Sequence, residues 1–264
     1  MPKCKVIAVT NQKGGVGKTT TTENVAIGLA RNGCNVLIVD FDPQGDLTSC
    51  LGWKNNDSLE HSVSSMLDDY INDNDINYES LILHHEEHVD LIPANIELAD
   101  FEMRLVSVIN REQTLSNCIE PLRNQYDYIF IDCPPSLGLV TLNAFTASDS
   151  VLIPIQCEYY ALEGLGQLIN TINLVKKRLN KELVIEGALL TMYDARTNLS
   201  NQVVKEVKNY FDDKVYKTVI PRNVKLSEAP SYGMPICMYD ARSKGSRCYD
   251  KFAKEFIKKN EDLK

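Results

Sequence analysis

The 264-residue sequence predicts an α/β fold, in which a doubly wound, mostly parallel sheet carries helices on both faces. Short apolar runs that favour strands alternate with longer helical patterns along nearly the whole chain. Runs such as 35–40 and 126–132 are almost continuously apolar, which is typical of strands buried on both faces. No repeat, low-complexity tract or linker interrupts the alternation, so we expect a single domain over residues 1–264.

The elements follow from their residue patterns. Strands are predicted where β-branched and other apolar residues run together, at 5–10, 35–40, 89–94, 126–132, 151–156, 183–193 and 215–220. Helices are predicted where apolar residues recur at helical spacing, at 21–32, 62–70, 96–108, 111–125, a stretch ending near 147, 160–180, 200–211 and 244–260. Residues 54–90 are acidic and rich in asparagine, and they predict little beyond the helix near 62–70.

The composition narrows the class of protein. No apolar run approaches the ~20 residues of a membrane span. Met1 leads almost directly into the first strand, which leaves no room for a signal peptide. Eight cysteines without a C-x-x-C pair indicate reduced thiols in a cytosolic protein.

The charge is unevenly distributed along the chain. Residues 1–195 carry 13 Lys or Arg against 27 Asp or Glu, whereas residues 196–264 carry 15 against 9. The net charge of −8 therefore combines a basic end with an acidic body. A basic end can hold contacts to a polyanion such as DNA, although solubility alone also explains such a distribution.

A glycine-rich segment, Asn-Gln-Lys-Gly-Gly-Val-Gly-Lys-Thr-Thr at 11–20, joins the first predicted strand to the first predicted helix. In this position glycines let backbone N–H groups turn toward a phosphate, at the positive end of the helix dipole. Lys18 can then reach the β- and γ-phosphates, and the Thr19 hydroxyl can ligate Mg²⁺. The other residues predicted to hold the nucleotide here are Lys13, Gly14, Gly15, Val16, Gly17 and Thr20.

Two acidic residues stand where predicted strands end. Asp42 follows the second strand within Phe-Asp-Pro-Gln-Gly, and Asp132 ends the strand at 126–132. The carboxyl ends of parallel strands meet at one edge of a sheet, so both carboxylates are expected near Lys18. We predict that Thr19, Asp42 and Asp132 hold Mg²⁺, and that Asp42 orients a water for phosphoryl transfer from the nucleotide.

These segments resemble a known family. Lys-Gly-Gly-Val-Gly-Lys-Thr-Thr at 13–20 resembles the deviant Walker A motif of the ParA/MinD class of P-loop ATPases, with Gln12 where the strict P-loop pattern has Gly. Five further segments resemble ParA/Soj signatures, at 40–45, 131–138, 154–164, 194–198 and 219–230. The resemblance covers nearly the whole chain and is poorest at 54–88.

The resemblance implies a chromosome- or plasmid-partitioning ATPase that uses ATP and Mg²⁺. Such proteins form a nucleotide-sandwich homodimer, bind double-stranded DNA without sequence preference, and are stimulated by a ParB/Spo0J-type partner. They are cytoplasmic and associate with the nucleoid. In the family, the counterpart of Lys13 reaches the phosphates of the partner subunit, and the counterpart of Asp42 supports hydrolysis.

The resemblance also assigns residues near the basic end. The residues matching Pro221, Arg222 and Asn223 contact the adenine, and those matching Arg196 and Lys225 contact DNA. We add Arg222 and Arg242 as candidate DNA contacts, because they lie in the basic part of the chain. Two residues depart from the family pattern. Lys225 stands where an arginine is more usual, so the charge is kept but the two-pronged phosphate contact is lost. Asp46 stands where an asparagine is usual, and its additional carboxylate near the phosphates leaves the rate of ATP hydrolysis and its metal dependence open.

Three alternative functions stay open from the sequence. A MinD-like membrane ATPase needs a C-terminal amphipathic anchor, but the apolar residues at 252–257 fit core packing better. An iron–sulfur reductase needs a second cysteine to hold the cluster together with Cys133, and the sequence offers no obvious one. An ATP-dependent ligase or kinase on the same fold needs a pocket for a small-molecule substrate. His-His-Glu-Glu-His at 84–88 is not H-E-x-x-H and suits a solvated loop, with at most adventitious metal binding. The sequence does not distinguish a chromosomal from a plasmid role or identify the partner.

Overall fold

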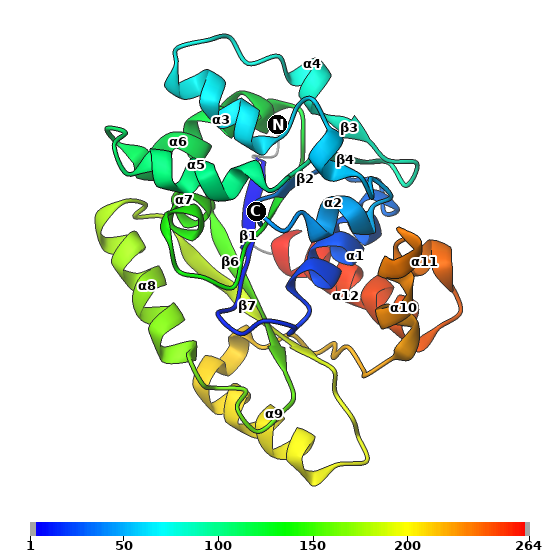
Figure 1. The fold of residues 1–264 in the computed structure, drawn as a ribbon. Helices are drawn as coiled ribbons and strands as arrows, with labels where there is room; N and C mark the ends of the chain where they lie inside the picture. The colour runs from blue at the N-terminus through cyan, green and yellow to red at the C-terminus, as the bar shows by residue number, and fades with distance from the viewer. Residues whose placement is uncertain (1–3, 262–264) are drawn as a thin grey trace.

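The computed structural model describes residues 4–261 and centres on a seven-stranded sheet of order β3-β4-β2-β5-β1-β6-β7 (Figure 1). The strands are β1 (Lys5–Val9), β2 (Val36–Asp40), β3 (Leu83–His84), β4 (Val89–Ile92), β5 (Tyr128–Asp132), β6 (Ser150–Gln156) and β7 (Val184–Thr191). All neighbours pair in parallel except β3 and β4 at one edge. The predicted α/β fold with a mostly parallel sheet is confirmed. Residues 1–3, on which the expectation about a signal peptide rests, and residues 262–264 lie outside the described part.

Successive side chains of a strand point to opposite faces of the sheet, so the strands contribute to two separate hydrophobic cores, one on each face. Ile7, Ile38 and Phe130 point to one face of the sheet, where they pack with α1 (Lys18–Ala30), α2 (Asp46–Cys50), α10 (Val224–Tyr232), α11 (Ile236–Tyr239) and α12 (Lys244–Glu261). Ala8 and Ile131 point to the other face. That face is covered by α3 (Val63–Ile71), α4 (Tyr78–Leu81), α5 (Glu97–Leu105), α6 (Thr114–Ile119), α7 (Leu139–Ala147), α8 (Leu165–Arg178) and α9 (Asn198–Phe211).

Two predicted elements are wrong. The single helix over 111–125 is three short pieces, because Pro121 lacks an N–H and begins a separate 3₁₀ turn at Glu120–Asn124. The strand over 215–220 makes only isolated bridges beside β7. Its N–H groups at Lys217 and Thr218 donate instead to the Glu255 carboxylate, at 2.6 and 2.8 Å.

Helices α10 and α11, over 224–239, were not expected from the sequence. Helix α8 begins at Leu165 rather than near 160, after Gly164 in a left-handed conformation. The added helix α10 matters for the site, because it forms one wall of a pocket described next.

Candidate nucleotide-binding site

The loop between β1 and α1 is shaped by glycines. Gly15 and Gly17 have φ angles of +71° and +89°, a left-handed conformation that strains other residues. A Cβ added at Gly14 or Gly15 would meet nothing within 4 Å, so the backbone is open to a ligand on that side. The loop therefore has the free, curved backbone that phosphate binding needs.

Side chains outside the predicted motif hold this loop in place. Asn11 Nδ2 donates to the carbonyl of Pro154 at 2.8 Å, and Asn11 Oδ1 accepts from the Lys13 N–H at 3.0 Å. The Thr191 hydroxyl donates to the Val16 carbonyl at 2.8 Å. The loop is thus fixed to β6 and β7, strands that lie far away in the sequence.

The loop opens into a pocket of about 350 Å³, at the carboxyl ends of the central strands. Of the residues predicted to act on the phosphates or the metal, Lys18, Thr19 and Asp42 line this pocket, whereas Lys13 does not. Lys18 is only 8% exposed, so its side chain lies within the pocket beside the glycine loop. The remaining lining residues are Gly14, Gly15, Gly17, Thr20, Gln44, Asp46, Pro135 and Met192.

Asp132 lies beneath the phosphate pocket and is bound by two threonines. Its Oδ2 accepts from the Thr19 hydroxyl at 2.8 Å, and its Oδ1 accepts from the Thr22 hydroxyl at 2.9 Å. Burial raises the pKa of Asp132 to about 7, against the two threonine bonds and the charge of Lys18. A bound divalent cation would favour the ionised form of this carboxyl group.

The donor set fits Mg²⁺. Thr19, Asp42 and Asp132 offer only oxygen atoms at one place, and Mg²⁺ prefers one or two protein oxygens with waters and phosphate completing its shell. Bound there, the ion would neutralise the charge that develops on the β- and γ-phosphates. No cluster of three His, Cys, Asp or Glu within residues 4–261 forms an all-protein metal site.

Asp42 is held in the same pocket by its own turn. Its Oδ1 accepts from the Gln44 N–H at 3.1 Å. Burial raises the pKa of Asp42, while this hydrogen bond and the nearby charge of Lys18 oppose the rise. A carboxyl group with a raised pKa beside the phosphates suits the predicted task of orienting a water.

Asp40 ties the segment after Asp42 to the sheet. It pairs in register with Asp132 on the neighbouring strand, and its Oδ2 accepts from the Thr48 N–H at 2.9 Å and the Thr48 hydroxyl at 2.7 Å. Burial, together with the charge of Asp132, raises the pKa of Asp40 to about 8. Asp40 therefore positions α2, which follows the Asp42 turn.

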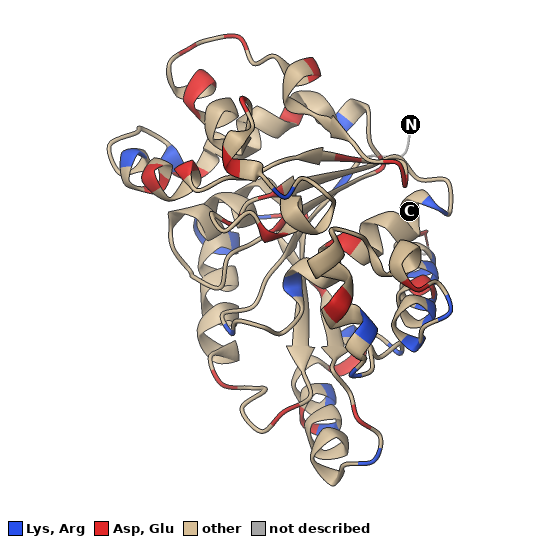
Figure 2. Cartoon of the chain, turned by 45° about the vertical axis from the view of Figure 1, so that its right-hand side comes forward, with Lys and Arg blue, Asp and Glu red and all other residues tan. Residues whose placement is uncertain are grey.

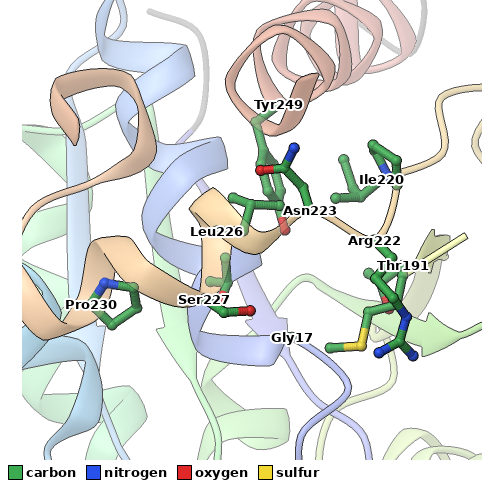
Figure 3. A pocket seen from close by; sticks show the side chains of 12 residues that line it. Gly17, Thr191, Ile220, Arg222, Asn223, Leu226, Ser227, Pro230 and Tyr249 are labelled. Atoms are coloured by element: carbon green, nitrogen blue, oxygen red, sulfur yellow. The ribbon is translucent and has the colours of Figure 1, made fainter. Parts of the chain in front are cut away.

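A second pocket, of about 280 Å³, adjoins the first and shares Gly17, Thr20 and Met192 with it (Figure 3). Pro221, Arg222 and Asn223, the residues predicted to contact the adenine, form part of its wall. Its other lining residues are mainly apolar: Thr191, Ile220, Leu226, Ser227, Pro230 and Tyr249. An apolar slot beside a phosphate cradle suits a nucleotide base.

Two polar groups in the second pocket bear on a base. The Oδ1 atom of Asn223 is buried without a hydrogen-bond partner in the described structure, so it is free to accept from a ligand. The Tyr249 hydroxyl, on α12, is 3.1 Å from the Thr21 hydroxyl on α1. Arg222, which also lines the slot, donates from its Nη2 to Glu158 at 2.7 Å.

Sequence reasoning missed Asn11, Thr22, Asp40, Thr191 and Tyr249. A run of four threonines at 19–22 is a local signal for Thr22, because residues three apart share a helix face. Thr191 and Tyr249 reach the site only through tertiary packing, and no local pattern marks them.

The comparisons with known proteins agree with this geometry. A family model described as an AAA domain matches residues 4–185. The chain is 59% identical over 251 residues to the sporulation initiation inhibitor protein Soj of Bacillus subtilis (strain 168), covering 95% of this chain and 97% of Soj. It is 50% identical to the chromosome partitioning protein ParA of Myxococcus xanthus (strain DK1622), covering 97% and 89%. The chain belongs to the ParA/Soj family of ATPases.

Solved structures with bound nucleotide share the fold of this ParA/Soj ATPase. Cobyrinic acid a,c-diamide synthase from Mycobacterium smegmatis, with ADP and magnesium, has a TM-score of 0.85 at 37% identity, covering 99% of this chain and 97% of that one. The septum site-determining protein MinD from Pyrococcus horikoshii OT3, with Mg-ADP, has a TM-score of 0.73 at 25% identity, covering 96% and 95%.

The cations predicted to contact DNA in this ParA/Soj ATPase are mostly neutralised within the chain. Three of the four form ion pairs of 2.7 to 2.8 Å: Arg196 with Asp194, Arg222 with Glu158, and Lys225 with Glu228. Hydrogen bonds from Arg196 lower the pKa of Asp194 to about 2, so that pair stays charged at neutral pH. Arg242 is exposed and forms no ion pair with any residue of 4–261.

Lys and Arg residues recur along helix α12 (Figure 2), and we call the exposed, unpaired set of them the α12 stripe. Its members are exposed, lie three or four residues apart, and have no ion pair among the described residues: Lys244, Arg247, Lys251, Lys254 and Lys258. At 1.5 Å per residue they extend along about 21 Å of one helix face. The stripe begins beside Lys225, because Gly245 packs against Leu226.

The remaining two features singled out in the sequence are the histidines at 84–88 and the apolar residues at 252–257. His84 Nδ1 lies 2.6 Å from Asp90, and the His85 ring packs on Trp53, so these two side chains stabilise the β3–β4 edge. Phe252 and Phe256 of α12 are fully buried and are not available to a membrane. None of the helices in 4–261 combines the length and the apolar character that crossing a bilayer takes.

Proposed function

We propose that this chain is an ATP-dependent partitioning protein for a chromosome or plasmid. In this proposal the ATP-bound form is a sandwich dimer that binds duplex DNA without sequence preference and hydrolyses ATP slowly. A ParB/Spo0J-type partner accelerates hydrolysis and so releases the DNA. The protein acts in the cytoplasm, on the nucleoid, without stable membrane association.

The observation that carries the proposal is the different placement of the two loop lysines. Lys18 lines its own phosphate pocket, whereas Lys13 does not, and the Lys13 ammonium group has no hydrogen-bond partner among the described residues. A lysine at the mouth of the loop with no internal partner is free to contact phosphates presented by a second copy, which supports the proposed dimer. Two such lysines would supply the charge that an arginine finger supplies in other P-loop enzymes.

Each remaining step has residues suited to it. Lys18 and the glycine backbone bind the phosphates, Thr19 and Asp132 hold the metal, and Asp42 orients the attacking water. The free Oδ1 of Asn223 can accept from the amino group of adenine, which guanine does not present at that position. The α12 stripe, with Arg242 and Lys225 beside it, supplies cations for the DNA backbone.

The test is binding to a random-sequence duplex without nucleotide, with ADP, and with ATP plus Mg²⁺, at low and moderate salt. Binding that requires ATP, weakens steeply with salt and disappears in Lys13→Ala supports the proposal. Absence of binding in every state would contradict it. Sedimentation with anionic liposomes would then test a MinD-like role.

A synthase role would follow from the name of the Mycobacterium smegmatis structure, which is similar to this chain over nearly its whole length. That role requires a modified small-molecule product. We expect ADP and phosphate as the only products of ATP in the presence of DNA and partner, and mass spectrometry of the reaction would reveal any other.

A further inference from the structure

Helix α5 has apolar residues on two faces, and only one face is covered. The inner face is buried in the core and consists of Leu98, Phe101 and Leu105. On the outside, Ile96, Met103 and Val106 are 54%, 70% and 59% exposed. A surface helix normally presents charged or polar residues on its outer side, so an apolar outer face requires an explanation.

The exposed apolar residues form one continuous line. Ile96 and Val106 flank the helix with helical φ and ψ angles, so the turns continue through both. With exposed Ala99 included, the residues are spaced three, four and three apart. At 3.6 residues per turn they fall within a sector of about 80° and extend for about 15 Å. We call this line, Ile96, Ala99, Met103 and Val106, the α5 face.

The α5 face is bordered by negative charge. Asp100 is exposed directly beside it, and exposed Glu97 lies further round the same flank of the helix; neither has an ion-pair partner within residues 4–261. Arg104 is the one cation of α5. It forms an ion pair with Asp68, to which it donates two hydrogen bonds of 2.7 and 3.0 Å. The border therefore keeps an unbalanced negative charge, in line with the acidic character of the first part of the chain.

We propose that the α5 face is the docking site of a basic amphipathic helix from a partner protein. An apolar line about three turns long accepts the i, i+3 or i+4, and i+7 anchors of one helix. The acidic border attracts lysines or arginines that flank such anchors, and it disfavours an acidic or purely apolar occupant. The inference rests on the proposed function, because the helix belongs to the partner that stimulates ATP hydrolysis.

The α5 face is physically connected to the phosphate pocket. Glu102, on the same helix, accepts from the Val140 N–H at the start of α7, at 3.4 Å. Gly138, which precedes α7, approaches Glu102 so closely that a Cβ there would overlap the carboxylate. This loop includes Pro135, which lines the phosphate pocket. A helix bound to α5 therefore lies one contact away from the loop that faces the phosphates.

The test is stimulation of ATP hydrolysis in the full chain by the ParB-type protein of the same genome. Met103→Ser with Val106→Ser is expected to raise the partner concentration for half-maximal stimulation at least about tenfold, since buried apolar anchors dominate such interfaces. Asp100→Lys is expected to weaken stimulation in the same direction. Basal hydrolysis and thermal stability should be unchanged, because these side chains are exposed and lie outside the nucleotide pocket.

Two matched controls test whether the effect is local. Leu174→Ser removes an apolar side chain of 47% exposure on α8, and Glu79→Lys reverses an exposed charge on α4. Neither should change stimulation. An unchanged response in the Met103/Val106 variant overturns the docking site while leaving the proposed function intact. Absence of stimulation in the wild-type chain overturns both.

A second copy of the chain or a membrane could cover the α5 face instead, and each would give a different experimental result. If the Met103/Val106 variant loses its ATP-dependent dimer by light scattering, the face contacts a second copy of the chain, and the proposal fails. If wild type sediments with vesicles of anionic lipid and the variant does not, the face contacts a membrane, and the proposal fails as well.

Discussion

Replacement of Glu23 by Gln is expected to remove a pH-dependent loss of stability. Glu23 lies on α1 and is 2% exposed. Its Oε2 accepts from Asn24 Nδ2 at 2.9 Å, but its Oε1 has no partner among residues 4–261. Burial raises the pKa of Glu23 to about 8, and the Asn24 hydrogen bond opposes only part of the rise.

The direction of the effect follows from proton linkage. The unfolded chain releases the Glu23 proton near 4.5, whereas the folded chain keeps it until about pH 8. Between these values the folded state binds more protons than the unfolded state, so stability falls as the pH rises, by about 1.4 kcal/mol per pH unit. From pH 5 to pH 7 the loss is about 3 kcal/mol. Below pH 4.5 or above about pH 8, Glu23 causes no further change in the free energy of unfolding.

Urea unfolding of wild type and Glu23→Gln at pH 5, 6 and 7 measures this loss. The free energy of unfolding of the variant, minus that of wild type, should grow by about 3 kcal/mol across the range. Asp40 and Asp132 also have raised pKa values and are present in both proteins, and the charge of Asp132 adds to the rise in the pKa of Glu23. Glu182→Gln, at an exposed site, is the control and should show no trend. A difference that stays constant with pH would mean that Glu23 is already ionised in the folded chain.

Further predictions concern the switch turn and the DNA contacts. Asp42→Ala is expected to trap an ATP-bound dimer that keeps binding DNA, and hydrolysis at the wild-type rate would show that Asp42 has another role. Gly45→Ala should lower the free energy of unfolding by about 1–3 kcal/mol, because Gly45 has a φ of +61° and a Cβ there would lie 2.8 Å from the Ala94 carbonyl oxygen; unchanged thermal stability would contradict this. Arg196→Glu should leave the dimer intact and weaken DNA binding, because it places a second negative charge beside Asp194; an unchanged affinity for a random duplex would show that Arg196 lies outside the DNA surface.

The nucleotide site could be predicted because most of its signals are local. The glycine loop binds phosphate through backbone shape, and strand, loop and helix follow one another in the sequence. Asp42 and Asp132 could be added because parallel strands bring their carboxyl ends to one edge. By contrast, Tyr249 enters the base pocket only because α12 returns across the sheet to pack on α1, where Ala253 contacts Gly28.

The two wrong elements have tertiary causes as well. The apolar residues at 215–220 are typical of a strand, and Tyr216 and Ile220 do donate backbone bonds to β7. The competing acceptor is Glu255, which lies about 40 residues further along the chain and takes the intervening N–H groups. Similarly, nothing in the sequence shows that Asp194, Glu158 and Glu228 would neutralise three of the predicted DNA cations.

The α12 stripe bears on how ATP could control DNA binding in the proposed function. The stripe is exposed in the single chain, so nucleotide need not uncover it. If its five cations each contact a phosphate, the logarithm of the binding constant should fall against that of salt with a slope of about −4.5 for one chain and about −9 for a dimer. The dimer has the steeper salt dependence because it makes twice as many phosphate contacts. At physiological salt its two linked stripes bind DNA far more tightly than the one stripe of a single chain. In the proposed function, dimerisation through Lys13 would therefore be sufficient to couple ATP to DNA affinity, with no rearrangement of the basic surface itself.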